Sequence, residues 1–189
     1  MRRSTVITLI LFALVLAAGI YFNNRARQQA EMEATPAATD VPIEYLFAPS
    51  DGTPNSIRIE SKAGQIVEVA RNAENAWAVI LPDEAAADQG SSEAAATQVT
   101  TMRILERVPG LSPAAVGLDD PEYIFSFRFT SGSERIMEVG VLTPTESGYY
   151  VRGEDGGIVI ISRSAVDALL GLLTSPPYAP TETPPPPTP

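Results

Sequence analysis

The sequence predicts an α+β fold in which antiparallel meanders of strands are each followed by one helix. Segments within residues 56–82 and 123–162 alternate apolar and polar side chains, with the period of two that half-buried strands show. Each set of strands precedes a segment whose apolar residues recur at helical spacing. An uncharged N-terminal run adds a predicted transmembrane helix ahead of this domain.

The first pass contains three predicted strands. The segments "SIRIES" and "QIVEVA" alternate in polarity on either side of a predicted turn at residues 62–64. The segment "AWAVILP" then brings Trp77, Val79 and Leu81 to one face of a third strand. These short spacings predict an antiparallel meander.

A helix is predicted over residues 92–108, after the polar, alanine-rich loop "DEAAADQGSSE". Glu93 suits the positive end of the dipole of that helix. The dipeptide "PG" ends the helix, and four apolar residues recur at helical spacing along it: Val99, Met102, Leu105 and Val108.

The second pass begins at "YIFSFRF", where Phe125, Phe127 and Phe129 point to one side, as in a strand buried on one face. The turn "SGSE" leads into "RIMEVGVL". The segments "GYYVRG" and "GIVIIS" then flank "EDGG", whose Asp155-Gly156 pair is favoured in hairpins because both residues tolerate positive φ.

A second helix follows, with a capping box predicted from Ser164 and Asp167. Its apolar face precedes a pair of prolines and consists of Val166, Leu169, Leu170 and Leu173. If the two passes are an internal repeat, the expected fold is an α+β sandwich with a helix closing each half.

The last 15 residues, "SPPYAPTETPPPPTP", contain eight prolines and predict an extended, disordered tail. We place the predicted domain at residues 43–178, which leaves residues 179–189 as a separate proline-rich region.

The strongest signal in the chain is the uncharged run at residues 5–22, which as a helix would measure about 27 Å, close to the hydrocarbon thickness of a bilayer. The competing interpretation is a signal peptide cleaved near Ala17 and Gly19, but cleavage there would leave "IYF" exposed. We therefore predict an uncleaved anchor at residues 1–24 and a juxtamembrane linker at residues 25–42. No cysteine follows the run, which excludes a lipoprotein.

The orientation of the anchor is weakly specified, because Arg2 and Arg3 on one side are matched by Arg25 and Arg27 on the other. We favour the N-terminus inside, since the free amine adds positive charge there and the acidic bulk of the chain translocates readily. The expected location is the cell membrane, single-pass, with most of the chain extracytoplasmic.

Composition excludes several classes of function. The chain has no cysteine and no histidine, which excludes thiolate or imidazole zinc sites, cysteine nucleophiles and histidine-based triads. Past Gln28 there are nine basic against 23 acidic residues, a net charge of −14. Such a surface repels phosphate backbones, so nucleic acid is not an expected partner.

The segment "VGLDDP" is either a site or a turn into the following strand. In an extended segment Asp119 and Asp120 point to opposite faces, and Pro121 biases Asp120 towards that conformation, so the pair is poorly placed to hold one ion. We favour the turn. Gly117 supplies a strained backbone, Asp119 bonds the backbone ahead, and Pro121 sets the entry into the strand.

Other candidate sites have simpler structural interpretations. The segment "RGEDGG" lacks the ligand spacing of a calcium loop and the lysine of a phosphate loop, which favours a hairpin turn. Trp77 is predicted to be in the core rather than to stack on a ligand. Tyr149 and Tyr150 must face opposite sides of their strand, so one of them is expected to be exposed and available for an interface.

Carboxylates and the lysine complete the candidates. Glu122 with Asp119 could act as acid and base in a glycosidase, but an acidic surface explains the same residues. Lys62 is the only lysine and lies beside a turn glycine without a Ser-x-x-Lys motif, which disfavours a lysine-assisted serine enzyme. We predict no catalytic, cofactor-binding or metal-binding residue.

Residues 43–177 resemble a bacterial family, the domain of unknown function 4340. The resemblance rests on "AWAVILP" followed by a helix, "VGLDDP" before a strand, "MEVGVLTP", "GYYVRG" and a last helix that runs into "SPP". Proteins of that family typically carry one N-terminal anchor, and some are associated with gliding-motility-type ABC transport systems. The resemblance implies a membrane-tethered accessory domain and assigns no catalytic residue.

The sequence therefore favours a non-catalytic, membrane-anchored domain that makes protein contacts in an envelope or transporter assembly, with an integral membrane protein as partner. The alternative is a binding module for an envelope ligand, a glycan or a divalent cation, and a carboxylate-dependent hydrolase is a third interpretation. A concave pocket with convergent polar groups would favour the binding module or the hydrolase. A flat apolar patch or a free sheet edge would favour the protein-contact domain.

Overall fold

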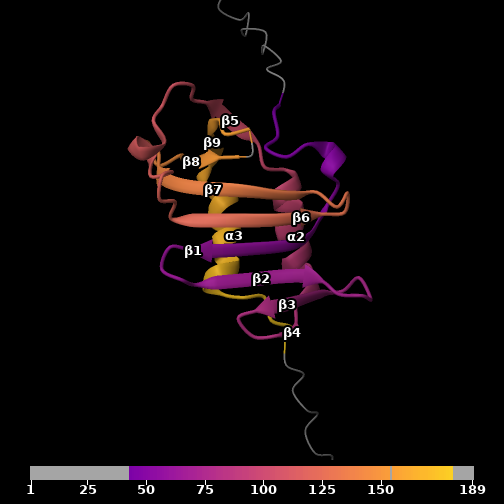
Figure 1. The fold of residues 1–189 in the computed structure, drawn as a ribbon. Helices are drawn as coiled ribbons and strands as arrows, with labels where there is room; N and C mark the ends of the chain where they lie inside the picture. Colours follow the sequence, from indigo (N-terminus) through magenta and orange to yellow (C-terminus); the bar gives the residue numbers. More distant parts are fainter. Residues whose placement is uncertain (1–42, 154, 181–189) are drawn as a thin grey trace, which may run out of the picture. The chain divides into compact units, whose positions relative to one another are not determined.

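The structure is a computed structural model that describes residues 43–153 and 155–180 (Figure 1). The chain divides between Pro42 and Ile43, and the described residues belong to the second of the two units. The predicted anchor and linker, and the tail beyond residue 180, lie outside the described residues. Within the described part of the chain, no helix has the length and apolar character needed to cross a membrane.

A single antiparallel sheet of nine strands and two helices make up the described domain, so the predicted α+β class is confirmed. The order across the sheet is β4-β3-β2-β1-β6-β7-β8-β9-β5. The strands are β1 (Pro54–Ser61), β2 (Ile66–Arg71), β3 (Trp77–Leu81), β4 (Ala85–Ala86), β5 (Ile104–Arg107), β6 (Tyr123–Phe129), β7 (Glu134–Leu142), β8 (Gly148–Arg152) and β9 (Ile158–Ser162).

Two meanders extend outward from the centre of the sheet. Strands β1 to β4 form one half and β6 to β9 the other, and the first strand of each half pairs with the first strand of the other, with Ile57 opposite Phe127. Helix α2 (Gln89–Thr100) follows the first meander and α3 (Arg163–Thr174) the second. The two passes predict this alternation of meander and helix but miss two strands, because the sequence pattern assigns β4 to a loop and β5 to the first helix.

Both helices cover the same face of the sheet, where Figure 1 shows them side by side behind the strands. The main core lies between the helices and this face, and the alternating residues of each strand contribute to it. Phe125, Phe127 and Phe129 are buried there as the sequence predicts, and the ring of Phe47 packs edge-on against Phe127 at 5.2 Å.

The predicted helix over residues 92–108 is wrong at both ends. Helix α2 begins at Gln89, because the side chain of Asp88 accepts a hydrogen bond from the backbone N–H of Ser91 at 2.7 Å and caps it. It ends at Thr100, and the chain continues as β5 along β9. Leu105 is 55% exposed, so the helical spacing of the apolar residues did not mark one buried face.

The capping box predicted at Ser164 is also wrong. Ser162 caps α3 instead, with its side chain accepting from the backbone N–H of Ala165 at 3.4 Å. Asp167 accepts a hydrogen bond from the hydroxyl of Tyr149 at 2.9 Å. The apolar face is as predicted in position, with Val166 and Leu169 buried, Leu170 and Leu173 half-buried, and Leu172 buried beside them.

Segments from the two ends of the domain pair beside the edge strands. Leu46 donates its backbone N–H to the carbonyl oxygen of Met102 at 2.9 Å, just before β5. At the other edge, Ala179 donates to the carbonyl oxygen of Ala86 at 2.9 Å. The prediction of a tail beginning at residue 175 is therefore wrong for its first five residues, because the free backbone groups of β4 give them hydrogen-bond partners.

Residues 108–122 lead from β5 at the sheet edge back to β6 at its centre, along the face opposite the helices. The short 3₁₀ helix η2 (Pro113–Val116) lies in this crossover. It packs closely on β7, since a Cβ atom at Gly140 would lie 2.1 Å from the carbonyl oxygen of Val116. A second, small core forms there from Val116, Leu118 and Ile158, with Leu111 and Tyr150 against it.

Candidate functional site

The segment "GLDDP" acts partly as the turn that the sequence predicts. Gly117 follows η2 with φ of 71°, a left-handed conformation that glycine adopts without strain. Two residues past Asp120, Glu122 donates its backbone N–H to Val139 at 3.0 Å and starts the pairing of β6 with β7. The predicted backbone bond of Asp119 is wrong, because its exposed side chain makes no hydrogen bond to any described residue.

Asp120 is part of a larger arrangement that the sequence did not indicate. Its carboxylate forms an ion pair with the ammonium group of Lys62, the only lysine, which lies 58 residues earlier in the chain. Both side chains are largely exposed, at 57% for Lys62 and 73% for Asp120. An exposed pair of this kind stabilises the fold by at most about 1 kcal/mol.

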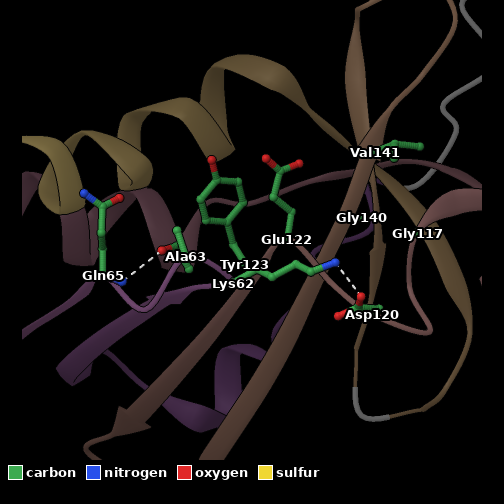
Figure 2. Close-up of a pocket in the computed structure, with 10 residues that line it drawn as sticks. Lys62, Ala63, Gln65, Gly117, Asp120, Glu122, Tyr123, Gly140 and Val141 are labelled. Carbon is green, nitrogen blue, oxygen red and sulfur yellow. Dashed lines mark hydrogen bonds and ion pairs between the residues drawn. The ribbon is translucent and has the colours of Figure 1, made fainter.

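The ion pair lies at the rim of a cavity of about 580 Å³ (Figure 2). Three segments far apart in the sequence line it: the turn between β1 and β2, the end of the crossover with the start of β6, and the bulged part of β7. The lining residues are Ser61, Lys62, Ala63, Gln65, Gly117, Asp120, Glu122, Tyr123, Gly140 and Val141.

The turn between β1 and β2 positions Lys62. Ser61 donates its backbone N–H to the carbonyl oxygen of Gln65 at 2.9 Å, and its hydroxyl accepts from the N–H of Gln65 at 3.1 Å. Lys62 donates its own backbone N–H to the carbonyl oxygen of Glu122 at 2.9 Å. The backbone of the lysine is therefore fixed beside the start of β6, where Asp120 and Glu122 lie.

Tyr123 and Glu122 project from the start of β6 into the same region (Figure 2). Burial raises the pKa of the Tyr123 hydroxyl, and the nearby negative charge of Glu122 raises it further, so the hydroxyl is protonated at neutral pH. The carboxylate of Glu122 has no hydrogen-bond or ion-pair partner among the described side chains. The cavity thus presents both hydrogen-bond donors and acceptors.

A second cavity, of about 250 Å³, lies by the segment that precedes β1. Asp51 is buried beside it and accepts hydrogen bonds from Arg135 at 2.8 and 3.2 Å and from the hydroxyl of Ser133 at 3.1 Å. Arg135 and Ser133 hold the pKa of Asp51 below its usual value, although burial acts in the opposite direction. These contacts attach the 3₁₀ helix η1 (Pro49–Asp51) to the β6–β7 hairpin.

Arg107 also lines the second cavity. Its guanidinium donates to Glu44 at 3.0 Å and to Asp155 at 3.2 Å, and these contacts raise the pKa of Arg107. The hairpin predicted at Asp155-Gly156 joins β8 to β9, and Gly156, at φ of 71°, donates its N–H to the carbonyl oxygen of Gly153 at 3.1 Å. Since each charged group here is paired, this cavity is a structural junction.

The aromatic candidates are built into the fold. Trp77 is 2% exposed, as predicted for a core residue, and its indole N–H donates to Glu93 at 2.8 Å. Glu93 lies in the second turn of α2 and pairs with Arg71. The prediction that Glu93 lies at the positive end of the helix dipole is therefore wrong. Tyr149 and Tyr150 face opposite sides as predicted, but both are half-buried, which corrects the expectation that one is exposed.

Within residues 43–153 and 155–180, no three carboxylates are grouped so that they could hold a metal ion. Asp120 and Glu122 both line the cavity at Lys62, whereas Asp119 is absent from its lining. The cavity therefore does not bring together Glu122 and Asp119, the acid–base pair considered from the sequence. No family model, curated protein or solved structure matches the chain, and the resemblance to domain of unknown function 4340 stays a prediction.

Proposed function

We propose that this protein is a non-catalytic domain held at a cell membrane by residues 1–24, where its extracytoplasmic part contacts an integral membrane protein of an envelope or ABC-transporter-associated assembly. The proposal draws in part on the resemblance of residues 43–177 to domain of unknown function 4340. The observation that carries it is a face of the sheet that neither helix covers.

This open sheet face consists of the side chains of β2, β1, β6 and the first part of β7, up to Ile136, that point away from α2 and α3. Ile136 is 51% exposed and Ile124 38% exposed on it. The two are diagonal neighbours, because Ile136 pairs with Ser126, two residues from Ile124. Charged residues surround them: Arg58, Glu60, Glu68, Arg128 and Glu134.

Apolar residues inside a polar rim are typical of protein contact surfaces. The ion pairs on the face are long, at 3.4 Å for Arg58 with Glu60 and 3.5 Å both for Arg58 with Glu68 and for Arg128 with Glu134. Glu68 is 19% exposed, whereas the other four side chains are between 39% and 65% exposed, so a partner could pair with those four groups at little cost. The open sheet face is therefore suited to a partner with both apolar and charged groups.

The position of the predicted anchor indicates where the partner lies. A linker over residues 25–42 could span at most about 60 Å when fully extended, and about 23 Å on average if flexible. Such a tether keeps the domain at an effective concentration of order mM for a neighbouring membrane protein. A weak contact through the open sheet face would then be sufficient, which is why we propose a partner embedded in the same membrane.

The two meanders support an internal repeat as part of the same proposal. Each is followed by a helix of 12 residues on the same face, and β1 and β6 pair in antiparallel fashion at the centre. The cavity at Lys62 favours a second candidate function, a binding module for an envelope ligand, because polar groups converge on it.

The proposal is tested by crosslinking the full chain in native membranes and identifying the recovered proteins. We expect the chain to stay in the membrane fraction through a carbonate wash, and transporter-type subunits to be recovered with it. Deletion of residues 43–174, with the anchor kept, should reduce that recovery sharply. Recovery that is unchanged by the deletion, or a chain that appears in the soluble fraction, would contradict the proposal.

A further inference from the structure

We propose that the cavity formed by Lys62, Gln65, Asp120, Glu122 and Tyr123 binds a neutral saccharide. These side chains come from the β1–β2 turn and from the start of β6, and they surround one hollow of about 580 Å³. The volume is within the range of small-molecule sites, about 300–1,000 Å³. This inference is independent of the protein contact proposed for the open sheet face.

The polar groups of the cavity complement hydroxyl groups, each of which both donates and accepts a hydrogen bond. Lys62 and the amide of Gln65 supply donors, and the carboxylates of Asp120 and Glu122 supply acceptors. The hydroxyl of Tyr123 can do either, since a phenol is protonated at neutral pH and both donates and accepts. A ligand with many neighbouring hydroxyls would use donors and acceptors together, whereas a simple ion would use only one kind.

The remaining walls give the ring of a sugar an apolar and unobstructed surface. The ring of Tyr123 and the side chains of Ala63 and Val141 supply apolar area. Gly117 and Gly140 line the hollow with backbone, and both are fixed as glycine, the first by its positive φ and the second by its contact with η2. The close packing of the crossover on β7 therefore depends on these two glycines.

The charges of the lining disfavour the other classes of ligand. A phosphate or another anion would lie against the carboxylates of Asp120 and Glu122, which repel it. A divalent cation would meet the ammonium group of Lys62 and would find only two carboxylates in this cavity. Lys62, Asp120 and Glu122 together carry a net charge of −1, which favours neither an anion nor a strongly charged cation. The lining is therefore compatible with a neutral ligand.

The adjacent aspartates provide a matched pair of variants. Asp120 lines the cavity and pairs with Lys62, whereas Asp119 is exposed and has no partner among the described residues. Asp120→Asn keeps the size of the side chain but removes its charge, and Asp119→Asn makes the same chemical change beside the cavity. Ala63→Trp tests the same site by volume, because it places a large ring at an exposed turn position that lines the hollow.

The experiment is calorimetric titration of the full chain with maltotriose and with triacetylchitotriose, each up to about 10 mM, a range that reaches weak millimolar affinities. The chain is held in phosphatidylcholine nanodiscs rather than in a sugar-based detergent. We expect saturable binding of at least one trisaccharide, weakened about tenfold or more by Asp120→Asn and by Ala63→Trp and unchanged by Asp119→Asn. Circular dichroism checks that each variant is folded.

Three results would overturn the inference. The first is the absence of binding by both trisaccharides, and the second is binding that a folded Ala63→Trp variant leaves unchanged. The third is saturable binding of calcium that Asp120→Asn abolishes, or of inorganic phosphate that Ala63→Trp abolishes, since the cavity would then serve an ion. None of these results bears on crosslinking through the open sheet face, so the two proposals fail separately.

Discussion

The two faces of the sheet have opposite characters along the same strands. On β6, Phe125 and Phe127 are fully buried under the helices, while Ile124 between β1 and β7 is 38% exposed on the other side. Successive side chains of a strand alternate between the faces, so each strand contributes to both. The helix-covered face determines stability, and the open sheet face can change with little effect on the fold.

The largest expected effect is on the helix-covered face. Phe127→Ala removes a ring that is 0% exposed and that packs against Phe47 and Phe129. We expect a loss of about 3–5 kcal/mol in the free energy of unfolding, from the lost burial and the cavity that remains. Urea unfolding followed by tryptophan fluorescence measures it, and a loss below about 1 kcal/mol would mean that this face is not the main core.

An intermediate loss of stability is expected at Asp51, a buried carboxylate near the end of the helix-covered face. Asp51→Asn removes a carboxylate that Arg135 and Ser133 stabilise, and should cost about 1–3 kcal/mol at neutral pH. The folded-state pKa of Asp51 is below its usual value, so its contribution is present above the unfolded pKa and is lost as the pH falls through the folded pKa.

The measurement is the free energy of unfolding against pH, from neutral down to about pH 2. The difference between the unaltered chain and Asp51→Asn should shrink as the pH falls below the pKa of a free aspartate, about 3.9. A difference that stays constant over this range would show that the charge of Asp51 does not contribute. The control is Asp119→Asn, whose side chain has no partner among the described residues and should leave the profile unchanged.

The sequence was sufficient for features that depend on local periodicity. The strands around Ile57 and Phe127, and the position of α3, follow from alternation and helical spacing over a few residues. It was insufficient at β5, since Leu105 fits a helical pattern and lies in a strand only because its neighbours Ile104 and Glu106 pair with β9 on either side of a bulge. Propensity was overridden by a tertiary contact at this point.

The candidate site could not be predicted for the same reason. Lys62 and Asp120 are 58 residues apart, and they meet because β1 pairs with β6 at the centre of the sheet. Nothing in the short motifs around either residue indicates that pairing. The composition offered the only hint of this site, because the chain has a single lysine, Lys62, and a pair of adjacent aspartates, Asp119 and Asp120.

The smallest effect on stability is expected on the open sheet face. Ile124→Thr combined with Ile136→Thr keeps β-branched side chains in both strands but removes exposed apolar surface. We expect the free energy of unfolding to change by less than about 1 kcal/mol. Urea unfolding provides the measurement, and a loss comparable to that of Phe127→Ala would remove the contrast between the two faces.

Crosslinking of this double variant in native membranes tests the central claim most directly. The matched control is Leu105→Thr, which changes a side chain of similar exposure, 55% against 51% for Ile136, at the edge strand β5. We predict that recovery of the membrane partner falls about tenfold or more for the double variant, as for loss of a central interface residue, and is unchanged for the control. Equal recovery from the double variant and the unaltered chain would contradict the account.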